Sequence, residues 1–589
     1  MKFHLYLLLL LTVNLGIIIQ STFADSITHV ANQSNNIGIK DFSISEIIIP
    51  DIIISGIESK IKIKFKNQSN GPITILVNGK ETKLEVNGGE AVIPYTFKES
   101  LQFTIHYEDF VYQKNISPIP LWMSILPPLV AILMALFFKE VISSLFLGIF
   151  IGSAIIHYYS SGLGGIFSGF LAVLDTYIIK SLENWDHLAI ISFSMIIGAM
   201  VTVISRNGGM QGVVDKISIY AKSAMSGQIT TYLLGVVIFF DDYANTLIVG
   251  NTMRPVTDKL KISREKLSYI VDSTAAPIAA IAFVTTWIGA QLGYIKDSVE
   301  IIDGLNESPY SIFINSLQYA FYPLFTLFFI LVLILKAKDF GPMLKAEKRA
   351  RSTGDNEINN IKSEGNEEIT SLEPVKGVTP RWYNAVIPIL VVIVGTIIGL
   401  LYTGRDPEIW NSADLSFFRK ISIIIGNADS YYALLWSSLS GLAVAIFLTL
   451  SQRIMSVHYT MESMMKGFKT MLGAVMILVL AWSLASVTED MHTADFITGI
   501  MLSFDINPIF IPAISFILAA LVAFSTGSSW GTMAILYPLM LPATWFMCKE
   551  MGLSEETTLM IFYNVVSTVL AGSVLGDHIS PISDTTILS

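Results

Sequence analysis

Long uninterrupted apolar runs constrain this chain of 589 residues more than any other feature. Each run is long enough to cross about 30 Å of hydrocarbon as a helix. Hydrophobic residues make up 52% of the chain and charged residues only 14%, which is outside the range of ordinary soluble domains. We therefore predict an all-α polytopic membrane protein over most of the length. The runs lie near 122–138, 141–157, 188–204, 229–253, 267–294, 312–335, 383–403, 432–451, 468–488, 507–525, 530–547 and 558–576.

The amino-terminal segment has the composition of a secretory signal. Residues 1–24 combine Lys2, an apolar stretch and the small-residue ending Thr22-Phe23-Ala24, which is the pattern of a cleavable signal peptide. A permanent first membrane anchor is the alternative. In both cases the segment that follows is exported, since the next long apolar run begins only at Leu121.

Residues 25–118 predict a small exported β domain. Residues 60–66 alternate lysine with Ile61, Ile63 and Phe65, which places the apolar side chains on one face of a strand. Asn78-Gly79 is a hairpin-turn signal. We expect an all-β, sandwich-like domain of about six or seven strands, preceding the helices.

The membrane part divides into two halves. A first half at 119–335 and a second at 382–589 flank a polar, charged segment at 336–381, which we expect to be a flexible cytoplasmic linker. Lys139 and the basic start of the linker then lie in the cytoplasm, and the acidic loop 295–311 lies outside, as the positive-inside rule requires.

The run 229–253 does not fit a simple span, because basic residues flank both of its ends. Both flanks favour the cytoplasm, which a re-entrant hairpin with its tip at Asp241-Asp242 would permit. This requires 164–180, a weaker run that carries Asp175, to be a partial or surface segment. A broken spanning helix is the alternative.

Asp241 and Asp242 are the candidate centre of an ion site. A charged side chain at the bilayer centre costs about 2.5–3.5 kcal/mol on insertion scales, so it is normally functional. Burial disfavours the charged carboxylate and a bound cation favours it, so Na⁺ and H⁺ would compete for one group. A structural ion pair with a base such as Arg254 is the alternative. The oxygen donors that would complete a tentative Na⁺ site with these acids are Asn245, Thr246 and Asn251.

Further polar clusters interrupt other apolar runs. Asp272, Ser273 and Thr274 precede Pro277, and because proline lacks a backbone donor we expect a helix break there, with a simple kink as the alternative. In the second half the candidate ion- or substrate-binding residues are Thr526, Ser528, Ser529, Asp577, Ser580, Asp584 and Thr585.

A shared spacing suggests duplication of the two halves. Asp242 precedes Pro255 by 13 residues, and Ser525 precedes Pro538 by 13. Ile262-Ser-Arg-Glu265 and Leu553-Ser-Glu-Glu556 then look like matching helix starts. If the halves form one site, Ser528, Ser529, Asp577 and Asp584 should lie near the first aspartate pair.

Four segments resemble signature segments of the NhaC-type Na⁺/H⁺ antiporter family: 239–246, 272–277, 527–532 and 576–586. The resemblance covers most of the chain from about residue 120. It implies an inverted-repeat transporter fold in which two hairpins or broken helices meet at mid-membrane. The family also includes exchangers of organic anions or amino acids. Relatives of this type usually continue past the terminal motif, so we expect the carboxy-terminal half to be incomplete.

The leading hypothesis is Na⁺/H⁺ antiport across the cell membrane, with no cofactor. Na⁺- or H⁺-coupled exchange of small organic anions or amino acids is an alternative, and a membrane-anchored receptor is an alternative of another class. An enzyme is not expected. Phosphate loops of the G-x-x-x-x-G-K type are absent from the sequence, so ATP-driven transport is unsupported. Expected partners are lipid, monovalent cations and, as a further option, a second copy in a homodimer; nucleic acid is not expected, since the net charge is −10.

Overall fold

The protein is described by a computed structural model that covers residues 43–67, 70–282, 284–302, 304–305, 307–353, 374–375, 377–412, 415–504, 506–580 and 583. The predicted signal at 1–24 lies outside these residues, as do Asp584 and Thr585 of the terminal motif.

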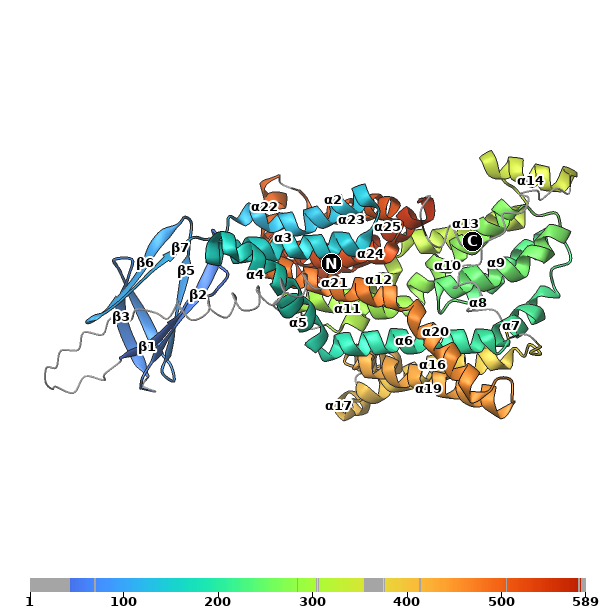
Figure 1. Ribbon diagram of the computed structural model, residues 1–589, viewed down its shortest axis with the longest axis horizontal. Helices are drawn as coiled ribbons and strands as arrows, with labels where there is room; N and C mark the ends of the chain where they lie inside the picture. Colours follow the sequence, from blue (N-terminus) through green and yellow to red (C-terminus); the bar gives the residue numbers. More distant parts are fainter. Residues whose placement is uncertain are drawn as a thin grey trace, which may run out of the picture. The chain divides into compact units, whose positions relative to one another are not determined.

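Seven strands form the predicted small β domain (Figure 1). They make a three-stranded sheet in the order β1-β2-β5 and a four-stranded sheet in the order β4-β3-β6-β7. The strands are β1 (Ile44–Ile48), β2 (Glu58–Phe65), β3 (Gly71–Val77), β4 (Lys80–Val86), β5 (Glu90–Thr96), β6 (Leu101–Tyr107) and β7 (Phe110–Ile116).

The sequence pattern of this domain explains its strands. Ile61 and Ile63 are fully buried on β2 while Lys60 and Lys62 are exposed, as expected for a strand with one face in a core. Asn78 and Gly79 both have positive φ, at 48° and 76°, and join β3 to β4 in a tight hairpin turn. The predicted alternation and this turn are confirmed.

Helices form nearly all of the remaining chain. In the first half they are η1 (Leu121–Ile125), α2 (Leu126–Phe138), α3 (Val141–Ser161), η2 (Gly162–Gly164), α4 (Gly165–Ala172), the π-helical η3 (Val173–Ile178), α5 (Ile179–Glu183), α6 (Trp185–Arg206), α7 (Gly209–Ser218), α8 (Ala224–Val237), α9 (Asp242–Lys259), α10 (Arg264–Ile281), α11 (Thr286–Glu300), α12 (Pro309–Ser316), η4 (Leu317–Tyr319), α13 (Phe321–Lys336) and α14 (Gly341–Thr353). In the second half they are α16 (Tyr383–Thr403), α17 (Pro407–Asn411), α18 (Phe417–Gly426), α19 (Ser430–Ser451), α20 (Val457–Thr470), α21 (Leu472–Asp490), α22 (Thr493–Ser503), η5 (Pro508–Phe510), α23 (Ile511–Thr526), α24 (Ser529–Glu550) and α25 (Glu555–Ile579).

Within the described residues, nine helical stretches are long and apolar enough to cross a membrane, or up to eleven if each of two bent pairs is one span. The bent pairs are α10 with α11 and the α12–η4 segment with α13, each bent by 47°. The multi-spanning helical architecture with broken helices is therefore confirmed.

The weak run 164–180 does not form an independent span. It follows α3 through a turn at Gly162, where φ is 70°, and α4 packs back along α3. The Ser153 hydroxyl donates to the Gly169 carbonyl oxygen at 2.8 Å across this contact. From Gly165 to Glu183 the chain is helical without a break, through α4, η3 and α5, and this stretch packs on the side of α3.

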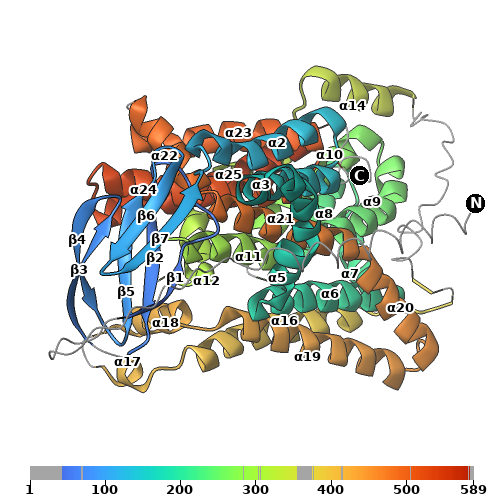
Figure 2. The ribbon, with the colours of Figure 1, turned by 60° about the vertical axis from the view of Figure 1, so that its left-hand side comes forward.

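The helices differ greatly in how far they are buried by other helices. In α24, 94% of the apolar window is buried, against 28% in the η1–α2 stretch. An apolar helix with exposed sides is stable only in an apolar medium, so α24 belongs to the protein core and α2 to the lipid-facing layer. In Figures 1 and 2, α16 and α19 lie together on the outer side of α6, which they contact.

The run 229–253 is interrupted at its aspartates, as the sequence predicted. It forms α8 and α9, separated by residues 238–241. The two helices pack against each other and both pack against α10 (Figure 1). The interruption at the aspartates is therefore confirmed, while the re-entrant course of this segment through the membrane stays a prediction.

The predicted helix break at Pro277 is wrong. α10 continues through Pro277 to Ile281, and the break falls at 282–285. Proline removes one hydrogen bond and crowds the preceding turn, but α8, α9 and α13 all pack on α10. Packing on several sides holds the helix together across the proline.

The predicted linker is not wholly irregular, because its first part forms α14. Two contacts fix this helix to the start of α10. Glu347 accepts hydrogen bonds from the Ser263 backbone N–H at 2.8 Å and from its hydroxyl at 2.7 Å. Just before α14, Asp339 forms a buried ion pair with Lys266 at 2.6 Å. These tertiary contacts order a segment that has little apolar periodicity of its own.

The two predicted helix starts after the tips are confirmed. Ser263 caps α10, where its hydroxyl accepts from the Lys266 N–H, and Ser554 caps α25, where its hydroxyl accepts from the Thr557 N–H. Each half therefore contains the same series, in which a helix, a polar tip and a second helix precede a serine-capped third helix.

Candidate ion-binding site

The first tip is built around Asp241, which is 4% exposed. Asp241 caps α9: one carboxylate oxygen accepts from the Ala244 N–H at 2.7 Å. The other accepts from the Thr286 hydroxyl at 3.1 Å, and the Thr286 N–H donates to the Phe240 carbonyl at 3.0 Å. A negative charge is favoured at a helix N-terminus. Two features thus hold Asp241 in place: the end of α9 and the first residue of α11.

Asn245 closes the turn between α8 and α9. Its amide nitrogen donates to the Gly235 carbonyl at 2.6 Å and to the Ile238 carbonyl at 3.0 Å, which satisfies groups that a helix end leaves without partners. The Asn245 amide oxygen and the Thr246 hydroxyl are buried, and within the described residues neither makes a hydrogen bond. Two oxygen atoms one turn from the tip are therefore available to a ligand.

Asp242, which is 3% exposed, connects the first tip to the second half. Its carboxylate lies beside the Trp287 indole and interacts electrostatically with Asp241 and with Asp577 of α25. Trp287 also meets Trp530 of α24 edge to face, with ring centroids 6.1 Å apart. Residues from both halves thus converge on Asp242.

The second tip carries the complementary groups. Ser528 caps α24, and its hydroxyl accepts from the Gly531 N–H at 3.2 Å. The buried Ser529 hydroxyl donates to an Asp577 carboxylate oxygen at 2.8 Å. In the first half, Asp241 at the tip accepts from the hydroxyl of Thr286, which follows α10. In the second half the roles are exchanged, because Ser529 at the tip donates to Asp577 near the end of α25.

A glycine sets the distance between α25 and α23. A Cβ atom added to Gly576 would lie 2.3 Å from the Ala520 carbonyl oxygen and 2.7 Å from the Phe524 backbone nitrogen. Only glycine permits this approach. Gly576 therefore allows the adjacent Asp577 to reach the second tip.

A fourth acid, Asp272, lies in the same region. It interacts electrostatically with His578 and with Tyr322 of α13. Tyr322 also interacts electrostatically with Asp577. The Tyr322 hydroxyl lies 2.9 Å from His578 Nδ1. Because Pro277 has no N–H, the Ser273 carbonyl loses its usual helical donor. α10 thus brings the Asp272 carboxylate to this region.

Not every predicted residue joins this group. Asn251 is exposed, because nine residues after Asp242 at 100° per residue it lies on the opposite side of α9. The Thr274 and Thr526 hydroxyls bond carbonyls of their own helices. Ser580 is buried just beyond the end of α25. Ser273 is buried within α10.

Thr286 and Trp287 were not among the predicted site residues. Their signal in the sequence is Thr285-Thr286-Trp287 inside an apolar run. The Thr285 hydroxyl accepts from the N–H groups of Trp287 and Ile288, both at 3.2 Å, and so starts α11. A hydroxyl pair before an aromatic residue is the pattern of a helix start, and it marks the true break.

Among the residues that the structure describes, no three His, Cys, Asp or Glu side chains converge as metal ligands. The oxygen groups at the two tips are instead the carboxylates of Asp241, Asp242 and Asp577 together with hydroxyl and amide oxygens. Oxygen ligands of this mixed kind suit a hard cation of low charge.

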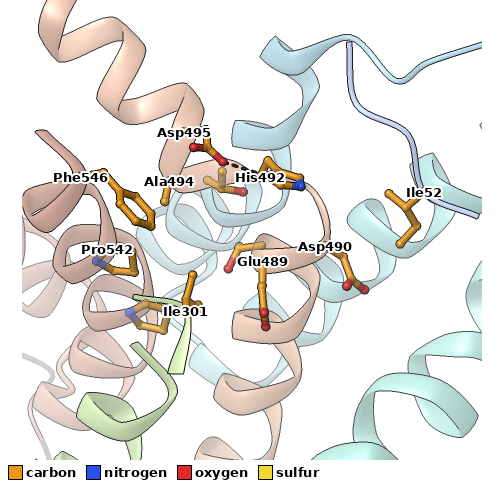
Figure 3. A pocket seen from close by; sticks show the side chains of 12 residues that line it. Ile52, Ile301, Glu489, Asp490, His492, Ala494, Asp495, Pro542 and Phe546 are labelled. Atoms are coloured by element: carbon orange, nitrogen blue, oxygen red, sulfur yellow. Dashed lines mark hydrogen bonds and ion pairs between the residues drawn. The ribbon is translucent and has the colours of Figure 1, made fainter. Parts of the chain in front are cut away.

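A cavity of about 440 Å³ lies farther along α24, beside Pro538 and Pro542 (Figure 3). Its acidic side chains include Asp490, which accepts from the Tyr177 hydroxyl at 3.1 Å, and Asp495, which pairs with His492 at 2.8 Å. It shares a helix with Ser529 but none of the tip residues line it. We therefore treat it as separate from the carboxylate site.

Comparison with known proteins identifies the family. The model of the Na⁺/H⁺ antiporter family matches residues 279–589, which is more than half of the chain. The chain belongs to this family. It is therefore a multi-pass membrane transport protein and not an enzyme, and the receptor alternative is not supported.

Three relatives can be named. An uncharacterized protein of Haemophilus influenzae is 29% identical over 469 residues, which cover 79% of this chain and 84% of that protein. Neisseria gonorrhoeae MtrF, of a class of antimetabolite efflux pumps, has a TM-score of 0.42 and 14% identity over 72% of this chain and 77% of its own. The Alcanivorax borkumensis YdaH transporter has a TM-score of 0.41 and 13% identity over 71% of this chain and 80% of its own.

Proposed function

We propose that this transporter exchanges Na⁺ for H⁺ through a site made by the carboxylates of both halves. The observation that carries the proposal is that Asp242 and Asp577, two buried acids from different halves, lie within electrostatic reach of each other. Neighbouring buried carboxylates cannot both remain charged without a counter-charge. A proton on one of them or a cation between them relieves the repulsion, and the two solutions exclude each other.

The neighbouring oxygen atoms support Na⁺ as the cation. The Asn245 amide oxygen and the Thr246 hydroxyl, without partners in the described part of the chain, lie on the same helix face as Asp242. They could replace part of the hydration shell that Na⁺ loses on entry. Ser529 would hold Asp577 in position in both states, since its hydroxyl donates to one carboxylate oxygen at 2.8 Å.

We further propose that the protein resides in the cell membrane with the β domain on the exported side. The signal-like residues 1–24 and the basic residues at Lys139 and at the start of α14 support this orientation. Na⁺ and H⁺ are the transported ions, and the exchange step uses no cofactor.

Exchange in proteoliposomes tests the function. Vesicles that contain the full chain and a pH-sensitive dye should show a pH change when a Na⁺ gradient is imposed. We expect Asp242→Asn and Asp577→Asn each to abolish this change while the protein still inserts, because each keeps the shape and removes the charge. The matched control is Asp215→Asn on α7, where the acid is exposed and bonded only to Gln211 among the described contacts.

Two results would contradict the proposal. The first is exchange with an unchanged pH profile in both site variants. The second is a correctly inserted wild-type protein that responds to no monovalent cation. A response that required an added amino acid or organic anion would instead favour the family's other type of substrate.

A further inference from the structure

We infer that His187 and Asp297 together bind one proton, and that this proton stabilises the contact between α6 and α11. The two residues come from different helices and are largely buried, with side chains 7% and 12% exposed. They lie outside the carboxylate site. The effect of this proton on exchange rests on the proposed function, whereas the presence of the proton does not.

Hydrogen-bond accounting at the His187 ring requires the proton. Nδ1 lies 2.7 Å from the Ser181 carbonyl oxygen, and Nε2 lies 2.9 Å from an Asp297 carboxylate oxygen. A carbonyl oxygen only accepts, so Nδ1 must carry a hydrogen. The contact at Nε2 then needs a hydrogen as well, either on the ring or on Asp297. A neutral imidazole and a charged carboxylate supply one hydrogen too few.

The surroundings favour the proton on this pair. His187 stacks on Trp482 with ring centroids 3.8 Å apart and planes 3° from parallel, and an aromatic face attracts a cationic ring. Lys296, the nearest lysine, is already bonded to Asp186 and to Glu300. The closest proton donor to Asp297 is therefore the His187 ring.

Several other ionisable groups face the pair from the helices packed around it. Glu300 and Lys296 act on Asp297 from α11, and Glu489 acts on it from α21. The remaining groups are Asp186 on α6, Tyr294 on α11 and Tyr431 on α19. Lys180 on α5 also acts on Glu489. The acids still outnumber the two lysines, and this negative surplus also retains a proton.

α11 connects this pair to the ion site. Asp297 lies eleven residues after Thr286, which is about 16 Å along one helix, and Thr286 donates to Asp241. Below its titration the proton stabilises the α6–α11 contact. As the pH rises and the proton leaves, two acceptors face each other and buried Asp297 loses its counter-charge. The contact between α6 and α11 then loses this stabilisation, and α11 no longer holds Thr286 in a fixed position.

Fluorescence tests the proton directly. A protonated imidazole stacked on an indole quenches its emission, so the wild-type spectrum minus that of Trp482→Phe isolates this indole. We expect the difference to rise with pH between pH 5 and 10 in the full chain, and the rise to vanish in His187→Gln. Asp297→Asn should fold, because its amide can donate to a neutral ring, and should change the pH dependence of the difference, because the proton is no longer shared with a carboxylate. A flat wild-type difference, or the wild-type pH dependence in Asp297→Asn, would overturn the inference.

The matched control is His492→Gln. His492 pairs with Asp495 at 2.8 Å, like the inferred pair, but both side chains are more than 40% exposed. It should leave the fluorescence difference unchanged. In proteoliposomes, we expect exchange by the wild-type protein to decline as the pH rises and the proton leaves. Asp297→Asn should reduce that decline, and His492→Gln should not. If the fluorescence titration appears as expected and no cation is exchanged, the proposed function fails and the proton site stands.

Discussion

Gly576→Ala gives the sharpest test of how the two halves meet. The added methyl group would lie 2.3 Å from the Ala520 carbonyl oxygen, whereas ordinary contact begins at 3.4 Å. The shortfall is about 1 Å, and the obstructing atoms belong to the backbone of α23, which cannot rotate away as a side chain can. α25 must therefore move by roughly that distance and carry Asp577 away from Ser529.

Two magnitudes follow from this displacement. A shift of about 1 Å at a reacting or binding group can cost about 10²-fold in rate, so we expect Na⁺-driven exchange to fall by about that factor. Overpacking of a close contact costs about 1–3 kcal/mol, so the thermal unfolding midpoint in detergent should also fall.

The control is Gly473→Ala in α21, where an added Cβ meets nothing within 4 Å. There we expect full exchange and an unchanged or slightly higher midpoint, since alanine favours a helix over glycine by about 0.5–1 kcal/mol. If Gly576→Ala matched Gly473→Ala in both measurements, the close approach of α23 and α25 would not be what positions Asp577.

Three further outcomes are expected. Asn245→Ala should destabilise the protein by about 1–3 kcal/mol in thermal unfolding, because the Gly235 and Ile238 carbonyls lose their donor; an unchanged midpoint would contradict its role in closing the tip. Lys266→Met should cost about 3–5 kcal/mol by leaving Asp339 buried without its partner, and Lys266→Met with Asp339→Leu should recover most of it; a double variant as unstable as the single one would refute the pairing argument. Deleting residues 25–116 behind the signal should leave the exchange rate per inserted protein unchanged, and loss of exchange at normal membrane levels would show that the β domain takes part in transport.

The site residues that sequence reasoning identified are those whose polarity conflicts with their surroundings. Asp241, Asp242 and Asp577 stand out because a charge in an apolar run is costly. Asn251 was misplaced because it was judged by nearness in sequence, although the helical period already places it on the other side of α9. Thr286 was missed because a single hydroxyl in an apolar run is a weak signal.

Other features depend on tertiary contacts that no local pattern contains. Pro277 looks like a helix break from the chain alone, and only the helices packed around α10 explain why the helix continues. α14 lacks an apolar stripe, and its order depends on Ser263 and Lys266, which lie more than 70 residues earlier. The His187–Asp297 pair likewise joins positions 110 residues apart.

The meeting of Asp242 with Asp577 has a consequence for biosynthesis. The two positions are 335 residues apart, so the ribosome must add all of the intervening chain before the second acid emerges. Until α25 is made, α8 and α9 lie in the bilayer without Asp577 beside their two aspartates. Contacts this distant in sequence form late, and the arrival of α25 therefore decides whether α8 and α9 are retained or degraded by membrane quality control.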